Sequence, residues 1–121
     1  MKKPIVAGPV IVEEGRVLLV QAGKDEFWKF PGGKMESFEN HPAEPTYREP
    51  KEELGIEIAI LEPTPFIFRK KNVVLYHYLS LRLTEITGGT AREWKWFSIE
   101  ELEKYALAEN VMPALKHFRF I

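Results

Sequence analysis

The chain has 121 residues, 17 Lys and Arg, 18 Asp and Glu, no Cys, and a formal net charge of −1. This length corresponds to one domain over residues 1–121, and the near-neutral charge argues against a protein that coats a nucleic-acid polymer or a membrane. No apolar run is long enough to span a bilayer, and residues 1–4 lack a secretory pattern. The absence of Cys fits a reducing compartment, and we expect the protein to be cytoplasmic.

Most of the expected elements are strands. Seven segments are rich in β-branched or aromatic residues and are bounded by Gly, Pro or polar turn residues. They are residues 5–12, 16–20, 26–30, 56–61, 64–68, 72–83 and 93–97. The first two flank Glu13-Glu14-Gly15 and are expected to pair as a hairpin.

Three helices are expected at intervals between or after these strands. Helix formers at residues 42–54 are followed by Gly55, which favours a helix end there. Ser98 and Glu101 have the spacing of a capping box, which predicts a helix reaching about Ala106, and a last helix is expected after Pro113. Strands that outnumber such dispersed helices predict an α/β (α+β) fold, with a mixed β-sheet sandwiched between helices.

The expected helix at 42–54 carries an unusual group of acidic residues. Glu49, Glu52 and Glu53 stand at i, i+3 and i+4, so the three carboxylates share one helical face, where they repel each other. A hard divalent cation such as Mg²⁺ or Mn²⁺ relieves that repulsion, and Arg48 can orient a carboxylate. The alternative is an ordinary solvated acidic face. Residues 36–57 carry a local charge of −5 against +4 elsewhere, which favours a small phosphorylated substrate.

Gly33, Glu39 and the run Arg48-Glu49-Pro50-Lys51-Glu52-Glu53-Leu54-Gly55-Ile56 resemble the Nudix box of MutT-like Nudix hydrolases, GX5EX7REUXEEXGU, with U a bulky apolar residue. The resemblance extends to the flanking segments and implies a Nudix fold. Two features depart from the pattern. The loop between Glu39 and Arg48 is one residue longer, and Pro50 occupies the first U position. An interior proline costs about 3 kcal/mol in a helix, so we expect the helix to kink or loosen there and catalysis to be weakened.

The resemblance also implies roles for individual residues. Gly33, Glu49, Glu52 and Glu53 would bind Mg²⁺ or Mn²⁺, with Arg48 orienting Glu49. Glu39 would brace the junction between loop and helix. The family's general base often lies outside the box; Glu93 is the candidate here, with an ordinary strand-edge glutamate as the alternative and Glu36 as a weaker choice.

Two further residues are candidates for contacting substrate. Lys34 follows Gly33 and is expected either to meet phosphate or to be a solvated lysine. Asn110 stands where an asparagine of the MutT-like group reads the edge of a base, and the alternative is that it caps the last helix. The three histidines, His41, His77 and His117, are expected to be structural or exposed.

These residues predict an enzyme that cleaves the pyrophosphate linkage of a nucleoside di- or triphosphate derivative. The MutT-like resemblance favours a (d)NTP pyrophosphohydrolase that uses Mg²⁺ or Mn²⁺, acts on a small nucleotide, and is a monomer or homodimer. The alternative is a Nudix-fold nucleotide-binding or regulatory module with weak catalysis. Pro50 and the longer loop favour this alternative, while the intact set of glutamates argues against it.

Overall fold

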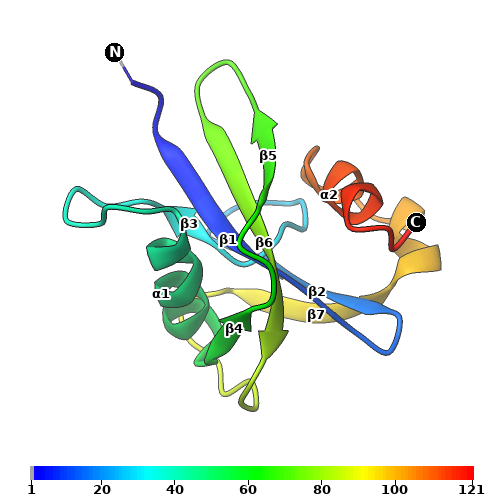
Figure 1. The fold of residues 1–121 in the computed structure, drawn as a ribbon. Helices are drawn as coiled ribbons and strands as arrows, with labels where there is room; N and C mark the ends of the chain where they lie inside the picture. Colours follow the sequence, from blue (N-terminus) through cyan, green and yellow to red (C-terminus); the bar gives the residue numbers. More distant parts are fainter. Residues whose placement is uncertain (1) are drawn as a thin grey trace.

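The computed structural model describes residues 2–121, and within them the chain forms seven strands and three helical segments (Figure 1). The strands are β1 (Ile5–Glu13), β2 (Arg16–Gln21), β3 (Gly33–Lys34), β4 (Ile58–Ile60), β5 (Phe66–Arg69), β6 (Val74–Arg82) and β7 (Glu93–Ser98). The helical segments are α1 (Ala43–Leu54), the 3₁₀ helix η1 (Ile99–Lys104) and α2 (Val111–His117). No helix in this part of the chain has the length and apolarity to cross a membrane.

The strands form a mixed sheet in the order β4-β6-β1-β2-β7, with β3 added beside β1 and β5 beside β6. The central pair, β1 and β6, is parallel, and the other pairs are antiparallel. The hairpin between β1 and β2 turns at Glu14 and Gly15, whose φ angles of 51° and 75° match the right-handed twist of the strands. The expected hairpin and mixed sheet are therefore confirmed.

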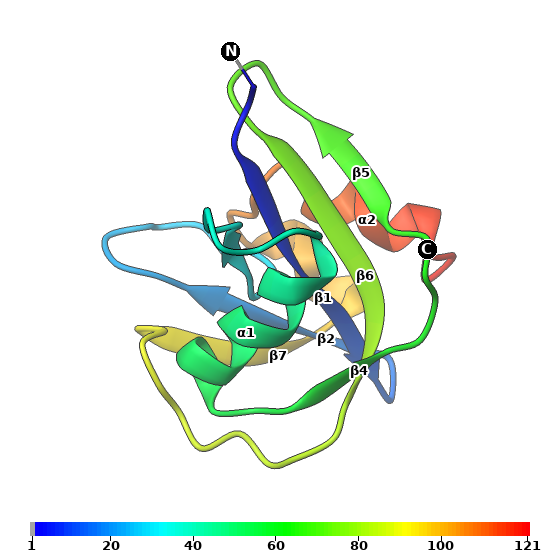
Figure 2. The ribbon, with the colours of Figure 1, turned by 60° about the vertical axis from the view of Figure 1, so that its left-hand side comes forward.

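Helices cover both faces of the sheet, with α1 on one side and η1 and α2 on the other (Figures 1 and 2). The alternation of side chains along β2 divides the core accordingly. Leu18 and Val20 pack with Leu54 from the end of α1, whereas Val17 and Leu19 pack with residues of α2 such as Leu115. The sheet thus fixes α1 against one face while the opposite face is closed by the C-terminal segment.

Three expected elements differ from the structure. Residues 26–30 form no regular strand, because Lys29 pairs with Val20 on one side while Trp28 pairs with the 106–108 segment on the other. The capping box at Ser98 is present, but it begins the 3₁₀ helix η1 and not an α-helix. The last helix begins at Val111 and not after Pro113, since proline is tolerated in a first turn whose N–H groups have no helical partners.

Helix α1 forms where it was expected, and it is continuous across the buried Pro50, at which we expected it to kink or loosen. The helix ends at Gly55, whose φ of 69° is left-handed and whose N–H donates to the Lys51 carbonyl at 3.0 Å. The longer loop before the helix is absorbed locally, because the N–H groups of Asn40 and His41 both donate to the Glu44 carboxylate. The effect of Pro50 on catalysis stays a prediction.

Candidate active site

Arg48 is the centre of a network of hydrogen-bonded carboxylates. Its Nε and one terminal nitrogen each lie 2.9 Å from an oxygen of Glu39, which is a bidentate pair. Its other terminal nitrogen donates to Glu49 at 2.6 Å and to Glu52 at 2.9 Å. One guanidinium group therefore holds three carboxylates in fixed relation to each other, two of them on its own helix.

Glu39 connects this network to the loop that precedes α1. Its side chain is buried, and besides binding Arg48 it accepts a hydrogen bond of 2.8 Å from the N–H of Glu36. The hydrogen bonds from Arg48 hold the pKa of the Glu39 carboxyl below its usual range. Arg48 also donates to the Lys34 carbonyl at 3.0 Å, so loop, β3 and α1 are tied at one point.

Gly33 lies directly beneath the Glu49 carboxylate. A Cβ atom at Gly33 would fall 2.3 Å from the Cδ of Glu49, so any other residue here would displace that side chain. Gly33 itself is held in place by the pairing of β3 with Ala7 of β1. The β3 backbone and the acidic face of α1 are consequently in direct contact.

Glu53 is the buried member of the acidic group, with 6% of its surface exposed. Its Oε1 accepts a hydrogen bond of 2.8 Å from the N–H of Gly32. Burial raises the pKa of the Glu53 carboxyl to about 7, and the negative charges of Glu49 and Glu52 add to this effect. The structure therefore places an energetically unfavourable negative charge at this position.

The residues present suit a divalent cation. In residues 2–121 no three Asp, Glu or His side chains converge as a preformed metal site, and Arg48 contacts both Glu49 and Glu52. The available donors are nonetheless carboxylate and carbonyl oxygens, the ligands that Mg²⁺ and Mn²⁺ prefer. A cation would also compensate the charge that burial and repulsion disfavour at Glu53.

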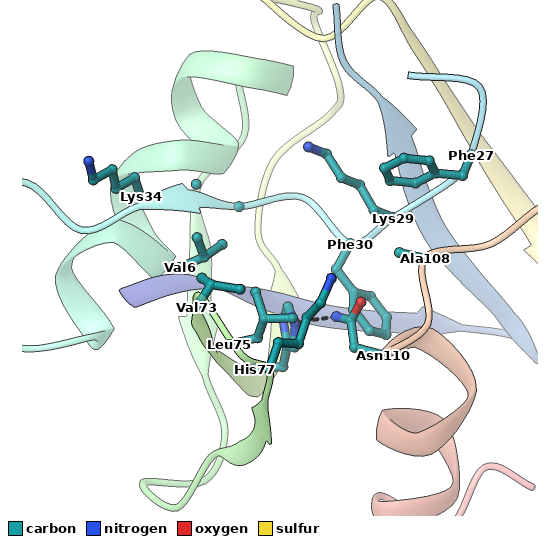
Figure 3. A pocket seen from close by; sticks show the side chains of 13 residues that line it. Val6, Phe27, Lys29, Phe30, Lys34, Val73, Leu75, His77, Ala108 and Asn110 are labelled. Carbon is teal, nitrogen blue, oxygen red and sulfur yellow. Dashed lines mark hydrogen bonds between the residues drawn. The ribbon is translucent and has the colours of Figure 1, made fainter. Parts of the chain in front are cut away.

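A cavity of about 360 Å³ opens beside this acidic group (Figure 3). Gly32 and Gly33 form one part of its wall, so the cavity begins where the β3 backbone meets α1. The remaining lining residues include two aromatic side chains, three lysines and two buried polar side chains. They are Phe27, Phe30, Lys29, Lys34, Lys70, His77 and Asn110, together with Val6, Val73, Leu75 and Ala108.

Both candidate substrate contacts, Lys34 and Asn110, line one cavity together with Gly33. Asn110 occupies the N-cap position of α2, yet its side chain makes no capping hydrogen bond. Its amide nitrogen lies instead 2.7 Å from Nε2 of His77, which sequence reasoning treated as merely structural. Lys29 and Lys70 were also missed.

The sequence contains signals for Gly8 and His77, two residues that were not predicted to belong to the site. Gly8 interrupts a β-branched strand, which often marks a close approach of two backbones. A Cβ at Gly8 would fall 1.8 Å from the Pro31 carbonyl oxygen, and the Gly8 carbonyl lies 3.3 Å from Nδ1 of His77. His77 itself is a polar residue within an apolar strand, a pattern that indicates a buried hydrogen-bonding group.

Glu93 is not among the residues that line the cavity. It pairs with Gln21 at the start of β7, and alternation places it on the sheet face of Lys95 and Phe97. Phe97 belongs to the core beneath α2, whereas α1 covers the opposite face. The strand register therefore gives no support to Glu93 as the base, and that role stays a prediction.

The fold and the acidic helix are those of a hydrolase that acts on nucleoside diphosphate derivatives. The NUDIX domain family model matches residues 1–118, and the chain belongs to the Nudix family. No match was found among curated proteins.

Several solved structures with the same fold match nearly the whole length of this chain. The E. coli ORF135 protein is 27% identical, with a TM-score of 0.74, over 98% of this chain and 89% of that one. A MutT NUDIX hydrolase from Burkholderia pseudomallei is 25% identical, with a TM-score of 0.76, over 96% and 98% of the two chains. A NUDIX family hydrolase from Clostridium perfringens, at 21% identity and a TM-score of 0.80 over 97% and 96%, shares the fold.

Proposed function

We propose that this chain is a metal-dependent pyrophosphohydrolase of nucleoside triphosphates, of the MutT-like type, that releases a nucleoside monophosphate and pyrophosphate. One observation carries the proposal: the acidic face of α1 meets, at Gly33, a cavity that offers lysines at its wall and aromatic and amide groups deeper inside. Such a cavity suits a ligand with one anionic and one planar end. The 25% identity to a MutT NUDIX hydrolase is in keeping with this type.

The carboxylates of Glu49, Glu52 and Glu53 and the Gly33 carbonyl would hold Mg²⁺ or Mn²⁺. When bound, such an ion lowers the pKa of a coordinated water and neutralises charge on phosphoryl oxygens. Arg48 keeps Glu49 and Glu52 from turning away into solvent, because it hydrogen-bonds both of them and is itself anchored by Glu39. The N–H of Gly32 holds Glu53 in its buried position.

Substrate would lie along the cavity with its phosphates toward Gly33 and its base toward Asn110. Lys34 lines the cavity next to Gly33 and supplies positive charge for a phosphate at that end. Phe30 and Phe27 provide apolar surface for a planar base, and Asn110 provides polar groups for its edge. Hydrolysis breaks one phosphoanhydride bond and consumes one water, and pyrophosphate is the leaving group.

A substrate screen with Mg²⁺ and with Mn²⁺ tests the proposal. Nucleoside triphosphates should be hydrolysed to monophosphate and pyrophosphate, faster than ADP-ribose or dinucleoside polyphosphates. The variant Glu53→Gln should lose about 100-fold or more in kcat, because it removes a metal-facing charge. The matched control is Glu57→Gln, since Glu57 is an exposed glutamate whose side chain pairs with Lys51.

Three outcomes would contradict the proposal, two from the screen and one from the variant. Tight binding of triphosphates without release of product, at any metal concentration, would identify a nucleotide-binding module with weak catalysis. A clear preference for ADP-ribose or a dinucleoside polyphosphate would leave the hydrolase in place but refute the triphosphate assignment. Activity retained by Glu53→Gln would mean that the acidic face of α1 is not the site.

A further inference from the structure

His77 connects the backbone of β1 to the amide of Asn110 deep in the cavity. Its Nδ1 lies 3.3 Å from the Gly8 carbonyl oxygen, and its Nε2 lies 2.7 Å from Nδ2 of Asn110. Both side chains are buried, with 3% of His77 and 6% of Asn110 exposed. The ring of His77 is further held by Phe30, at 4.8 Å between ring centroids.

The Gly8 carbonyl determines the direction of every hydrogen bond that follows. A carbonyl oxygen can only accept, so Nδ1 of His77 must carry the proton that it donates. Burial without a neighbouring acid lowers the pKa of His77 to about 4, so the ring is neutral and Nε2 has a free lone pair. Nε2 therefore accepts from Nδ2 of Asn110, and the amide oxygen of Asn110 is turned away from His77 (Figure 3).

This orientation leaves the cavity with a single kind of side-chain acceptor. The lysines that line it, Lys29, Lys34 and Lys70, can only donate, and both ring nitrogens of His77 are engaged. Among the lining side chains of the described residues, Oδ1 of Asn110 is thus the one acceptor. Every fully buried side-chain oxygen or nitrogen in residues 2–121 has a hydrogen-bond partner. Oδ1 of Asn110 makes no hydrogen bond, so it is not fully buried and is open to the cavity.

We propose that His77 is a positioning residue that fixes the amide of Asn110 so that the cavity selects bases with an amino group at C4 of a pyrimidine or C6 of a purine. Cytosine and adenine present such a donor, whereas uracil and hypoxanthine present a carbonyl oxygen at the same place, which Oδ1 repels. The inference rests on the proposed function, in which a nucleotide base enters this cavity. It adds a substrate class, and it assigns a role to a buried histidine of β6.

The selectivity is measured as a ratio of kcat/KM within matched pairs of substrates. CTP should exceed UTP, and ATP should exceed ITP, each by about tenfold or more, because the oxo base leaves a buried acceptor unpaired. In His77→Phe, which keeps an aromatic ring beside Phe30, the amide is free to rotate and both ratios should fall toward one. His117→Phe, at an exposed histidine beside Phe66, is the control and should keep both ratios.

A second set of measurements needs no turnover. A long-range ¹H–¹⁵N correlation spectrum at pH 7 should show His77 protonated at Nδ1 and unprotonated at Nε2. The side-chain amide of Asn110 should show one proton displaced by its hydrogen bond to the ring, and that displacement should vanish in His77→Phe. Titration with CMP and UMP gives the same selectivity as a ratio of Kd values.

The outcomes separate the two proposals. If no nucleotide is hydrolysed, the proposed function fails, while the spectrum and the CMP and UMP titrations still decide the present inference. A proton on Nε2, equal or reversed ratios in the wild-type chain, or ratios unchanged in His77→Phe would each overturn it. Should His77→Phe fail to fold, Asn110→Leu takes its place, and ratios that persist without the amide would refute the inference equally.

Discussion

Neutral, buried His77 should make the stability of the fold depend on pH. Burial lowers the pKa of His77 from 6.5 to about 4, so the unfolded chain takes up a proton in a range where the folded chain does not. The stabilising contribution is present above pH 6.5 and is lost as the pH falls toward 4. The shift corresponds to about 3 kcal/mol in total, of which about 2 kcal/mol should be lost between pH 6.5 and pH 5.

The contribution must be measured as a difference between two proteins, because Glu53 acts in the opposite sense. The pKa of Glu53 is raised from 4.5 to about 7, so its contribution to stability grows as the pH falls through this range. Comparing the wild-type chain with His77→Gln cancels the Glu53 effect, which is common to both. Urea unfolding without divalent metal at pH 7 and at pH 5 gives the four free energies required.

We expect the wild-type chain to lose about 2 kcal/mol more than His77→Gln between pH 7 and pH 5. His117→Gln, at an exposed histidine, is the matched control and should follow the wild-type chain. Parallel pH profiles for wild type and His77→Gln would refute the reasoning, because they would mean that His77 binds its proton equally in the folded and unfolded states. The same result would weaken the assignment of its neutral tautomer.

Three other predictions concern the frame of the site. Gly8→Ala should lower the free energy of unfolding by several kcal/mol (about 3 or more), because its Cβ would fall 1.8 Å from a backbone oxygen. The comparison is Gly23→Ala, which has open space around its Cβ and should lose only about 1 kcal/mol through its left-handed φ of 54°; equal losses in urea unfolding would contradict the steric argument. Pro50→Leu should raise the urea midpoint or kcat, because it restores an interior helix hydrogen bond and removes a penalty of up to about 3 kcal/mol. No gain in either quantity would show that α1 has fully accommodated the proline. Glu93→Gln should cost less than about tenfold in kcat, since Glu93 lies on the sheet face opposite α1; a loss as large as that of Glu53→Gln would restore Glu93 as the general base.

Local patterns predicted the elements that depend on local chemistry. The hairpin at Glu13-Glu14-Gly15, the end of α1 at Gly55 and the alternating strand β6 each follow from residues within a few positions of one another. The strand predicted at residues 26–30 was wrong because its partners are distant in the sequence. Its aromatic residues favour an extended backbone, but its hydrogen bonds go to two separate segments, and neither partner is visible in the local sequence.

The acidic group and the cavity differ in the same way. The spacing of Glu49, Glu52 and Glu53 fixes their common face because a helix has a regular period, and Arg48 follows from the same geometry. The contact between Asn110 and His77 joins residues 33 positions apart, and it depends on the parallel register that sets Gly8 opposite His77. Neither residue type predicts that register, because it results from how the whole sheet assembles.

The charge of the chain takes on a spatial meaning in this arrangement. Glu49 of the acidic segment 36–57 contacts Gly33, and the cavity that Gly33 helps to line also contains Lys29, Lys34 and Lys70 in its wall. The charge of Lys29 partly opposes the rise in the pKa of Glu53 that burial causes, so the two regions act on one another electrostatically. A polyphosphate that entered the cavity alone would gain from the lysines but would meet the repulsion of the carboxylates at its anionic end. A divalent cation removes that repulsion, so binding of the metal and binding of the phosphates favour each other.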